Sequence, residues 1–276
     1  MTASTEPDAP DAPSYVFDND DPEAADRHGY LAEILDGQTV QRLSGLGDLT
    51  GRRCLEIGAG GGSIAHWLAH AAGPAGRVLA TDINTRYLSP DADFDVLRHD
   101  LVSEPVPEGP WDVIHARLVL LHLPQRREIL HRLTAALAPG GALVLEDFET
   151  TFRKSVLAAP TPECAELVDT YHRVLVEHVL PAHGNDPTWA GQVYAAMLAE
   201  GMTELDTVVY ARSWPGGTAG ALLIAANIAQ AREGFLAAGM SDAQLDELQR
   251  LASDPRLVVR GPLTYSTIGR RPAEHP

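Results

Sequence analysis

Between residues 50 and 150, short apolar runs alternate with segments whose apolar residues recur at helical spacing. Apolar runs bounded by turn residues predict buried strands, and they lie at Arg53–Ile57, Arg77–Ile83, Phe94–Leu101, Trp111–Arg117 and Ala142–Phe148. Apolar residues three and four positions apart predict a helix over Ile64–Ala71 and another over Ile129–Leu137. We expect Pro139-Gly140-Gly141 to end the second helix.

The segments on either side carry periodic patterns of their own. Ahead of the first strand, Tyr30, Leu31, Ile34 and Leu35 share one face of a helix predicted to start near Asp26. Beyond residue 150 we expect helices at 161–180, 189–200, 220–238 and 241–251, and strands at 203–212, 257–259 and 263–269. A capping box, Ser241 to Gln244, opens the last of these helices.

This order of elements predicts an α/β fold. Strands that alternate with helices form a doubly wound, mostly parallel sheet with right-handed crossovers. Ligands of such sheets bind outside the carboxyl ends of the strands. We divide the chain into an acidic tail expected to be disordered, a core, a helical insertion and a closing segment, at 1–25, 26–150, 151–202 and 203–276.

The turn after the first strand reads Glu56-Ile57-Gly58-Ala59-Gly60-Gly61-Gly62-Ser63. Glycine lets a backbone turn sharply and approach a ligand closely, and the next helix supplies free N–H groups. A dinucleotide fingerprint needs a third glycine where Ser63 stands, and a phosphate loop needs a terminal G-K-[ST] that is missing. Glu56 would be awkward beside a pyrophosphate but suits a ligand that carries an ammonium group.

Five segments in register resemble the class I S-adenosylmethionine (SAM) methyltransferases. They are the glycine turn, the strands that end at Asp82 and before Asp100, and the runs W-D-V-I-H-A-R-L-V-L-L-H-L-P and L-A-P-G-G-A-L-V-L-E-D. The resemblance covers about residues 50–150. It implies a Rossmann-like seven-stranded sheet with an antiparallel last strand. It also implies that the insertion at 151–202 forms a lid over the acceptor.

The resemblance also implies a set of cofactor-binding residues. Asp82, about twenty residues beyond the glycine turn, stands where a doubly wound fold places the carboxylate that binds the ribose hydroxyls. Asp100 and Leu101 match the positions that bind adenine, and Tyr30 would lie near the SAM carboxylate, although plain packing is an alternative. The full predicted set is Tyr30, Glu56, Gly58, Ala59, Gly60, Gly62, Asp82, Ile83, Asp100, Leu101, Ala116 and Arg117.

The sequence motifs are less specific for the residues that would bind the acceptor or catalyse the reaction. His115 and Asp147 are candidate general bases because they fall at strand ends, whereas His122 follows an apolar run and reads as a core histidine. In the insertion, Tyr171, His172 and His178 are candidate substrate-binding residues; the spacing of the histidines predicts no metal site.

Charge narrows the classes of partner. The formal net charge is −17, which opposes nucleic-acid binding because that needs a basic surface. With an apolar insertion, the charge favours a neutral or cationic, partly hydrophobic acceptor. The sequence has no apolar run long enough to span a membrane, no signal peptide, and two cysteines without a disulfide framework, so we expect a cytoplasmic protein. The sequence leaves the oligomeric state undecided, with a homodimer as one alternative.

We therefore predict SAM-dependent methyl transfer to a small molecule, with O, N and C atoms all open as acceptors and secondary metabolism as a setting. The alternative is a SAM-binding scaffold that catalyses a cyclisation or rearrangement, or that only binds, because cofactor motifs report binding and not chemistry. A nicotinamide oxidoreductase is disfavoured by Ser63 and Glu56.

Overall fold

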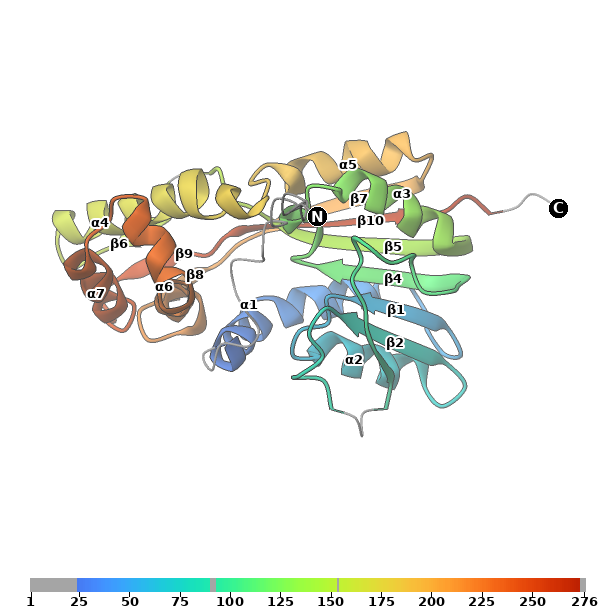
Figure 1. The fold of residues 1–276 in the computed structure, drawn as a ribbon. Coiled ribbons are helices and arrows are strands. Elements are labelled where there is room, and N and C mark those ends of the chain that lie inside the picture. Colours follow the sequence, from blue (N-terminus) through green and yellow to red (C-terminus); the bar gives the residue numbers. More distant parts are fainter. Residues whose placement is uncertain (1–23, 90–92, 153, 274–276) are drawn as a thin grey trace, which may run out of the picture.

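The main sheet of the computed structural model has seven strands (Figure 1) in the order β3-β2-β1-β4-β5-β10-β7. The structure describes residues 24–89, 93–152 and 154–273, so the predicted acidic tail lies almost wholly outside the described residues. The strands are β1 (Arg53–Ile57), β2 (Arg77–Asp82), β3 (Asp95–Arg98), β4 (Trp111–Arg117), β5 (Leu137–Glu149), β7 (Thr203–Tyr210) and β10 (Leu263–Arg270). The first five are parallel, and β10 runs antiparallel to both β5 and β7.

Helices cover both faces of this sheet. On one face lie α1 (Ala24–Ser44) and α2 (Ser63–Ala72), and on the other lie α3 (Arg126–Ala136) and α5 (Trp189–Ala199), as Figure 1 shows. A short 3-10 turn, η1 (Leu120–His122), follows β4. Strand order reverses between β1 and β4, so the carboxyl ends of these two strands form the crevice where ligands of such sheets bind.

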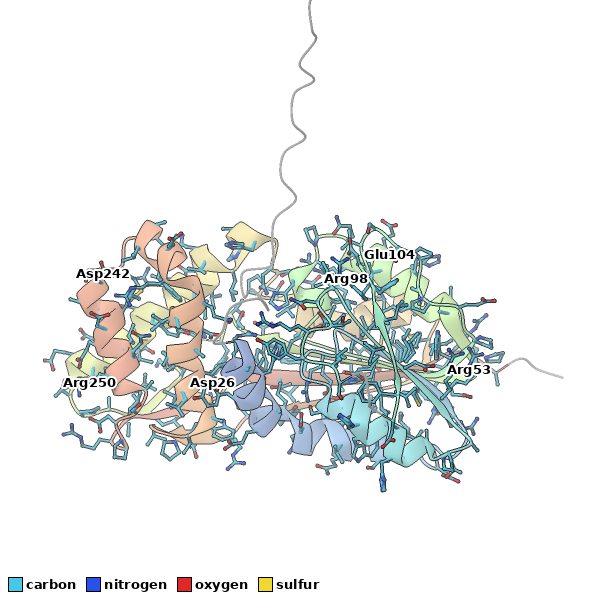
Figure 2. All side chains as sticks on the ribbon, turned by 60° about the horizontal axis from the view of Figure 1, so that its bottom comes forward. Asp26, Arg53, Arg98, Glu104, Asp242 and Arg250 are labelled. Carbon is cyan, nitrogen blue, oxygen red and sulfur yellow. The ribbon has the colours of Figure 1, made fainter. Side chains whose placement is uncertain are left out.

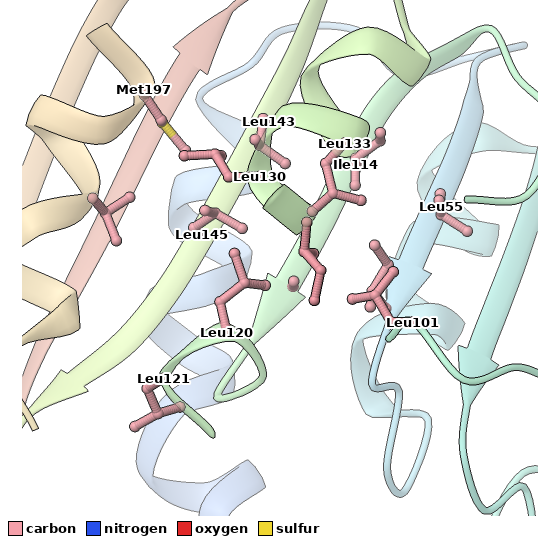
Figure 3. Close-up of a cluster of buried hydrophobic side chains, with 14 of the residues drawn as sticks. Leu55, Leu101, Ile114, Leu120, Leu121, Leu130, Leu133, Leu143, Leu145 and Met197 are labelled. Carbon is pink, nitrogen blue, oxygen red and sulfur yellow. The ribbon is translucent and has the colours of Figure 1, made fainter. Parts of the chain in front are cut away.

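Successive residues of each central strand pack into opposite hydrophobic layers, as the period of two requires. Leu55 and Ile114 join the layer under α3 and α5, while Cys54 and Val113 join the layer under α2. Figure 3 shows the first layer, which extends from Met197 of α5, beside leucines of α3 and β5, to Leu55 of β1 at the other side of the cluster. Both layers are dry and closely packed, which makes the strands a rigid support for the loops at their ends.

A second unit lies beside the carboxyl edge of the sheet. It combines α4 (Pro162–Val174), a π-helical extension η2 (Leu175–Val179), α6 (Ala219–Ala237) and α7 (Asp242–Leu251) around a separate hydrophobic cluster. Its polar outer surface is seen in Figure 2, where Asp242 and Arg250 project from α7. The unit draws on segments before and after β7. Of the predicted insertion, the part from Val156 to Leu180 packs in this cluster, whereas Trp189 and Val193 of α5 pack in the main core.

The predicted elements differ from the structure in three places. In a second, three-stranded sheet of β6 (Val156–Ala158), β8 (Ser213–Pro215) and β9 (Val258–Arg260), the strand at β9 was predicted at 257–259, but β6 and β8 were not, because three-residue strands carry no periodicity. Helix α3 ends at Ala136, and Pro139-Gly140-Gly141 lies within β5, at a register shift against β4. A 3-10 turn, η3 (Pro181–His183), follows η2. The capping box at Ser241 is confirmed.

Candidate functional site

A cavity of about 510 Å³ opens at the carboxyl ends of β1, β2 and β4. The glycine turn, the end of β2, the loop after β3, the loop after β4 and the first turns of α1 line it. Eight of the predicted cofactor residues line this first cavity: Gly58, Ala59, Gly60, Asp82, Ile83, Asp100, Leu101 and Arg117. The structure thus brings these eight residues together around one cavity.

The glycine turn is shaped by steric limits at two positions. Gly58 has a φ of +64°, and a Cβ there would lie 2.4 Å from Cγ2 of Val119, so any other residue would strain the backbone and displace the Val119 side chain. Gly60 also has a positive φ, +53°, and its N–H donates to Oδ2 of Asp82 at 2.9 Å. The turn and the end of β2 are therefore joined directly at the cavity wall.

Asp82 is buried, with 7% of its surface exposed. Its Oδ1 accepts from the N–H of Asn84 at 2.9 Å. Burial raises the pKa of this carboxyl, and the hydrogen bonds from Asn84 and Gly60 oppose that rise. Each carboxylate oxygen can accept a further hydrogen bond, so the residue is held in position and still able to bind hydroxyl groups.

Asp100 forms a local turn at the rim of the cavity. Its Oδ2 accepts from the Ser103 hydroxyl at 2.6 Å, and its Oδ1 accepts from the N–H of Val102 at 2.9 Å. The Ser103 hydrogen bond is the largest of the influences that lower the pKa of Asp100. The carboxylate is therefore charged and oriented, with Leu101 beside it at the cavity wall.

Four predicted cofactor residues do not line the cavity. Tyr30 packs between the main core and the second unit, which is the packing alternative stated above. Gly62 caps α2 with a φ of +81° and faces Leu88, while Ala116 is part of the core. Glu56 is 3% exposed and pairs with His115 behind the turn.

Arg27 and His28 line the cavity, and sequence reasoning missed them. They stand one turn before Leu31 on α1, so their side chains reach the strand ends that α1 crosses. Burial, followed by the charge of Arg27, lowers the pKa of His28 to about 4, so this imidazole is neutral at neutral pH. His28 meets the Tyr87 ring edge-on at 5.2 Å. The available signal was a polar pair at the start of an otherwise apolar helix face.

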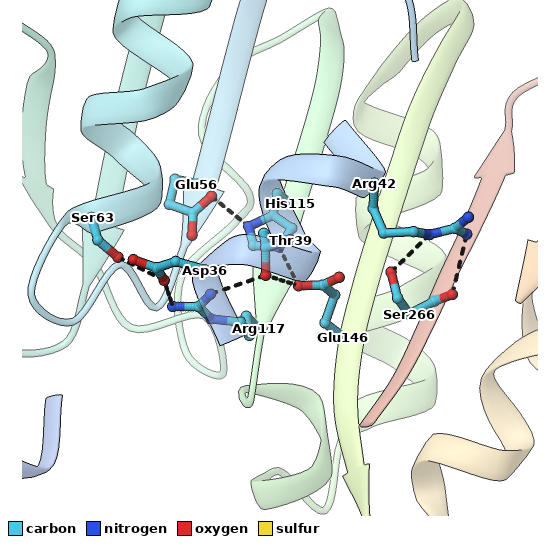
Figure 4. A network of polar contacts seen from close by, with 9 residues as sticks. All are labelled: Asp36, Thr39, Arg42, Glu56, Ser63, His115, Arg117, Glu146 and Ser266. Carbon is cyan, nitrogen blue, oxygen red and sulfur yellow. Dashed lines mark hydrogen bonds and ion pairs between the residues drawn. The ribbon is translucent and has the colours of Figure 1, made fainter. Parts of the chain in front are cut away.

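A buried polar network lies directly behind the site (Figure 4). His115 is fully buried, with Nδ1 2.7 Å from Glu56 Oε2 and Nε2 3.5 Å from Glu146 Oε2. Burial opposes a charge on His115, but Glu56 and Glu146 outweigh it and raise its pKa to about 9. The network reaches the cavity through Thr39, which donates to Glu146 and accepts from Arg117 Nη1 at 3.0 Å.

A second cavity of about 120 Å³ adjoins the first. Arg27, Leu118 and His122 line both cavities. Of the predicted substrate-binding residues, Tyr171 and His172 line the second cavity, whereas His178 is exposed and lines neither.

The two candidate bases lie away from both cavities. His115 is held between two carboxylates, and Asp147 is 2% exposed beside Leu121. Burial raises the pKa of Asp147 well above its usual value; a backbone hydrogen bond at Leu121 lowers it less, and nearby Glu146 raises it further. Neither side chain faces space that a ligand could occupy in these cavities. The structure thus offers no support for their predicted catalytic role.

Nothing in the described ranges groups three or more histidine, cysteine, aspartate or glutamate side chains in a way that could hold a metal ion. Over the same residues, no helix combines the length and apolar character needed to cross a bilayer.

The fold and the cavity together define a protein of the doubly wound α/β class with a ligand-sized cavity at its first glycine turn. A family model described as a methyltransferase domain matches residues 25–192, which is more than half of the chain. The chain belongs to this methyltransferase family, and the predicted family is confirmed.

Relatives and solved structures agree with this assignment. The chain is 40% identical over 105 residues to methyltransferase str2 of Strobilurus tenacellus, which is 36% of each protein. It is 33% identical over 140 residues to 27-O-demethylrifamycin SV methyltransferase of Amycolatopsis mediterranei (strain S699), covering 44% of this chain and 50% of that one. The matches thus span half or less of these relatives.

The fold is similar to the crystal structure of a candidate methyltransferase from Bacillus halodurans C-125, with a TM-score of 0.52 and 14% sequence identity. The superposed part covers 86% of this chain and 98% of that one. This likeness shows the fold, and the predicted fold class is confirmed.

Proposed function

We propose that this protein transfers a methyl group from SAM to a small-molecule acceptor. The observation that carries the proposal is the first cavity, where a glycine turn of restricted shape and a buried carboxylate, Asp82, meet at the switch point of a methyltransferase-family fold. The O-methylation implied by the name of the Amycolatopsis relative supports a small-molecule acceptor.

The residues present fit SAM. A volume of about 510 Å³ lies within the usual range for small-molecule sites. Asp82 would bind the ribose hydroxyls, and Asp100 with Leu101 would hold the adenine. The backbone from Gly58 to Gly60 would lie against the methionine part.

The buried network would act on the ligand through charge. With His115 protonated between two carboxylates, Glu56 and Glu146, the cluster keeps one net negative charge directly behind the turn. A cationic ligand at the turn is favoured by that charge, because the surroundings are largely dry. Glu56 would therefore favour a cationic ligand through its charge, from a position behind the glycine turn. This role replaces the direct contact with the cofactor that the sequence predicted.

SAM supplies an electrophilic methyl group on a sulfonium. The chain's own contribution is to hold the acceptor and the methyl in line and to exclude water, which lowers the barrier without an acid or base at the reacting atoms. Leu118 and Val119, which follow β4 along the cavity wall, keep this space apolar. A cytoplasmic location and a homodimer stay predictions from the sequence.

The test is S-adenosylhomocysteine formation from methyl-deuterated SAM, followed by mass spectrometry of panels of small phenols, quinones and amines. We expect a mass gain of one deuterated methyl group in members of one panel. The Asp82→Ala variant serves as a control and should form less product at limiting SAM. SAM binding without product in any panel would favour the non-methylating scaffold instead.

A further inference from the structure

The two cavities meet at a seam, which we define as Arg27, Leu118 and His122, the three residues that line both. If SAM occupies the first cavity, as in the proposed function on which this inference rests, the acceptor must reach the methyl group across the seam. The second cavity is then where the rest of the acceptor lies.

The charge at the seam is positive. Arg27 is 7% exposed, and its Nε donates to Oδ1 of Asn227 at 3.1 Å. His122 is half-buried and neutral, since burial, followed by the charges of Arg27 and Arg126, lowers its pKa to about 3. The other ionisable side chains that line the second cavity are Glu149, Tyr171, His172 and Arg260. Arg27 is therefore the arginine that lines both cavities, in a chain whose net charge is −17.

Hydrogen bonds fix the position of this guanidinium. Asn227 accepts from Arg27 and donates from Nδ2 to the Tyr171 hydroxyl at 3.2 Å. Tyr171 is itself a buried phenol in the second cavity. Burial raises its pKa to about 12, and the hydrogen bond with Asn227 and then the charge of Arg27 act in the opposite direction.

The size of the second cavity limits what enters it. An apolar cavity of about 150 Å³ takes up one benzene molecule, and this one measures about 120 Å³. Its wall is largely apolar, with Phe148, Val168, Leu175, Leu223 and Ile224 among the lining residues. Three lining residues carry a buried polar atom without a hydrogen-bond partner in the described part of the chain: Oγ1 of Thr150, Oδ1 of Asn185 and Nε of Arg260. Of these, Oδ1 of Asn185 can accept from a ligand donor. The space therefore suits a single six-membered ring with few polar groups.

We propose that the acceptor is a phenol or a cyclic enol that places one ring in the second cavity and its hydroxyl oxygen at the seam, where Arg27 stabilises the oxyanion. The hydroxyl proton leaves to solvent as the acceptor binds. The oxyanion lone pair then forms the new oxygen–carbon bond, while the carbon–sulfur bond of SAM breaks and its electron pair stays on sulfur. The reaction is O-methylation, and it needs no general base in the bound complex.

This acceptor class agrees with part of the sequence-based expectation and refines the rest. A phenol is neutral and partly hydrophobic in solution, as the acidic surface favours. Its ionisation on binding follows from the local charge of Arg27, which the net charge of the chain does not reveal.

The experiment uses 4-nitrophenol as the probe, because its phenolate absorbs visible light and its phenol does not. The probe is added to the wild-type protein saturated with S-adenosylhomocysteine, so no methyl transfer occurs, and absorbance is followed from pH 5 to 8. An adjacent opposite charge lowers a pKa by about 1–3 units, so we expect a phenolate-to-phenol ratio at least about tenfold higher for bound than for free probe.

Two variants locate the cause. Arg27→Gln should remove the rise in phenolate, whereas Arg27→Lys should keep part of it because the charge is retained. Arg256→Gln removes an equal charge from an exposed side chain that pairs with Asp254, and it should behave like the wild type. If Arg27→Gln does not fold, the comparison of bound with free probe in the wild type decides alone.

Three results would overturn the inference. They are an unchanged or lower phenolate ratio for the bound probe, a rise that persists in folded Arg27→Gln, and no binding of 4-nitrophenol. Calorimetric titration of S-adenosylhomocysteine in the same buffer separates the two claims. If the nucleoside binds and the probe behaves in any of these ways, the acceptor class is wrong and the proposed function stands. If the nucleoside does not bind, the proposed function itself fails.

Discussion

Replacing His115 by glutamine would leave Glu56 and Glu146 buried without the cation that lies between them. In the wild type, His115 is fully buried, 2.7 Å from one carboxylate and 3.5 Å from the other (Figure 4). Breaking a buried ion pair by removing one partner costs about 3–5 kcal/mol, because the remaining charge stays out of water. We expect His115→Gln to lower the free energy of unfolding by that amount near neutral pH.

The wild type gives a second, independent estimate through pH. The pKa of His115 is raised from 6.5 to about 9 in the folded state, so its contribution is fully present below pH 6.5 and is lost as the pH rises through 9. A shift of this size corresponds to on the order of 3 kcal/mol. The lowered pKa of Glu146 affects stability at acidic pH. Its contribution is present above 4.5, the pKa of the unfolded state, and is lost as the pH falls through the lower pKa of the folded state.

Urea unfolding at pH 6.5 and pH 9.5 measures both effects. The wild type should lose stability between these two values, and His115→Gln should lose much less. His131→Gln is the matched control, because His131 also pairs with a glutamate, Glu200, but its side chain is 70% exposed, and such pairs are worth at most about 1 kcal/mol. Equal unfolding midpoints for His115→Gln and the wild type, or equal pH dependence, would refute the charged network.

Three further predictions concern the two cavities. Asp82→Ala should weaken SAM binding by about 1.5–3 kcal/mol, the usual worth of charged hydrogen bonds; an unchanged calorimetric affinity would remove Asp82 from the site. Gly60→Val forces a branched side chain into a positive φ and into the cavity, so it should abolish SAM binding, with circular dichroism to confirm that the variant is folded. His172→Ala should raise the acceptor KM and leave the SAM dissociation constant unchanged, whereas His178→Ala, at an exposed position, should change neither in steady-state assays.

The fold was predictable where the chain repeats a local rule. Each central strand is a short, largely apolar run, and the strands Arg53–Ile57 and Trp111–Arg117 have the predicted bounds. The positions of the glycine turn and of Asp82 were predictable in the same way, since each lies at a characteristic distance along the chain from β1. Strand β6 could not be found in this way, because three residues pair with distant β9 and carry no pattern of their own.

The candidate site was predictable only for residues whose position follows from the strands. Arg27 and His28 reach the cavity from α1, and that placement depends on how α1 packs against α6, which no local pattern encodes. His115 and Asp147 line neither cavity, for the opposite reason. They fall at strand ends as the rule requires, but side chains alternate between the faces of a sheet, and both are enclosed by neighbouring elements.

The central claim is that the cavity at the glycine turn binds SAM. Native mass spectrometry of the protein incubated with equimolar SAM, NADH and ATP tests it most directly, because all three ligands compete for one site and differ in mass. We predict a single adduct with the mass of SAM, and a marked loss of that adduct in Asp82→Ala. Retention of NADH or ATP in place of SAM, or no adduct at all, would contradict the account.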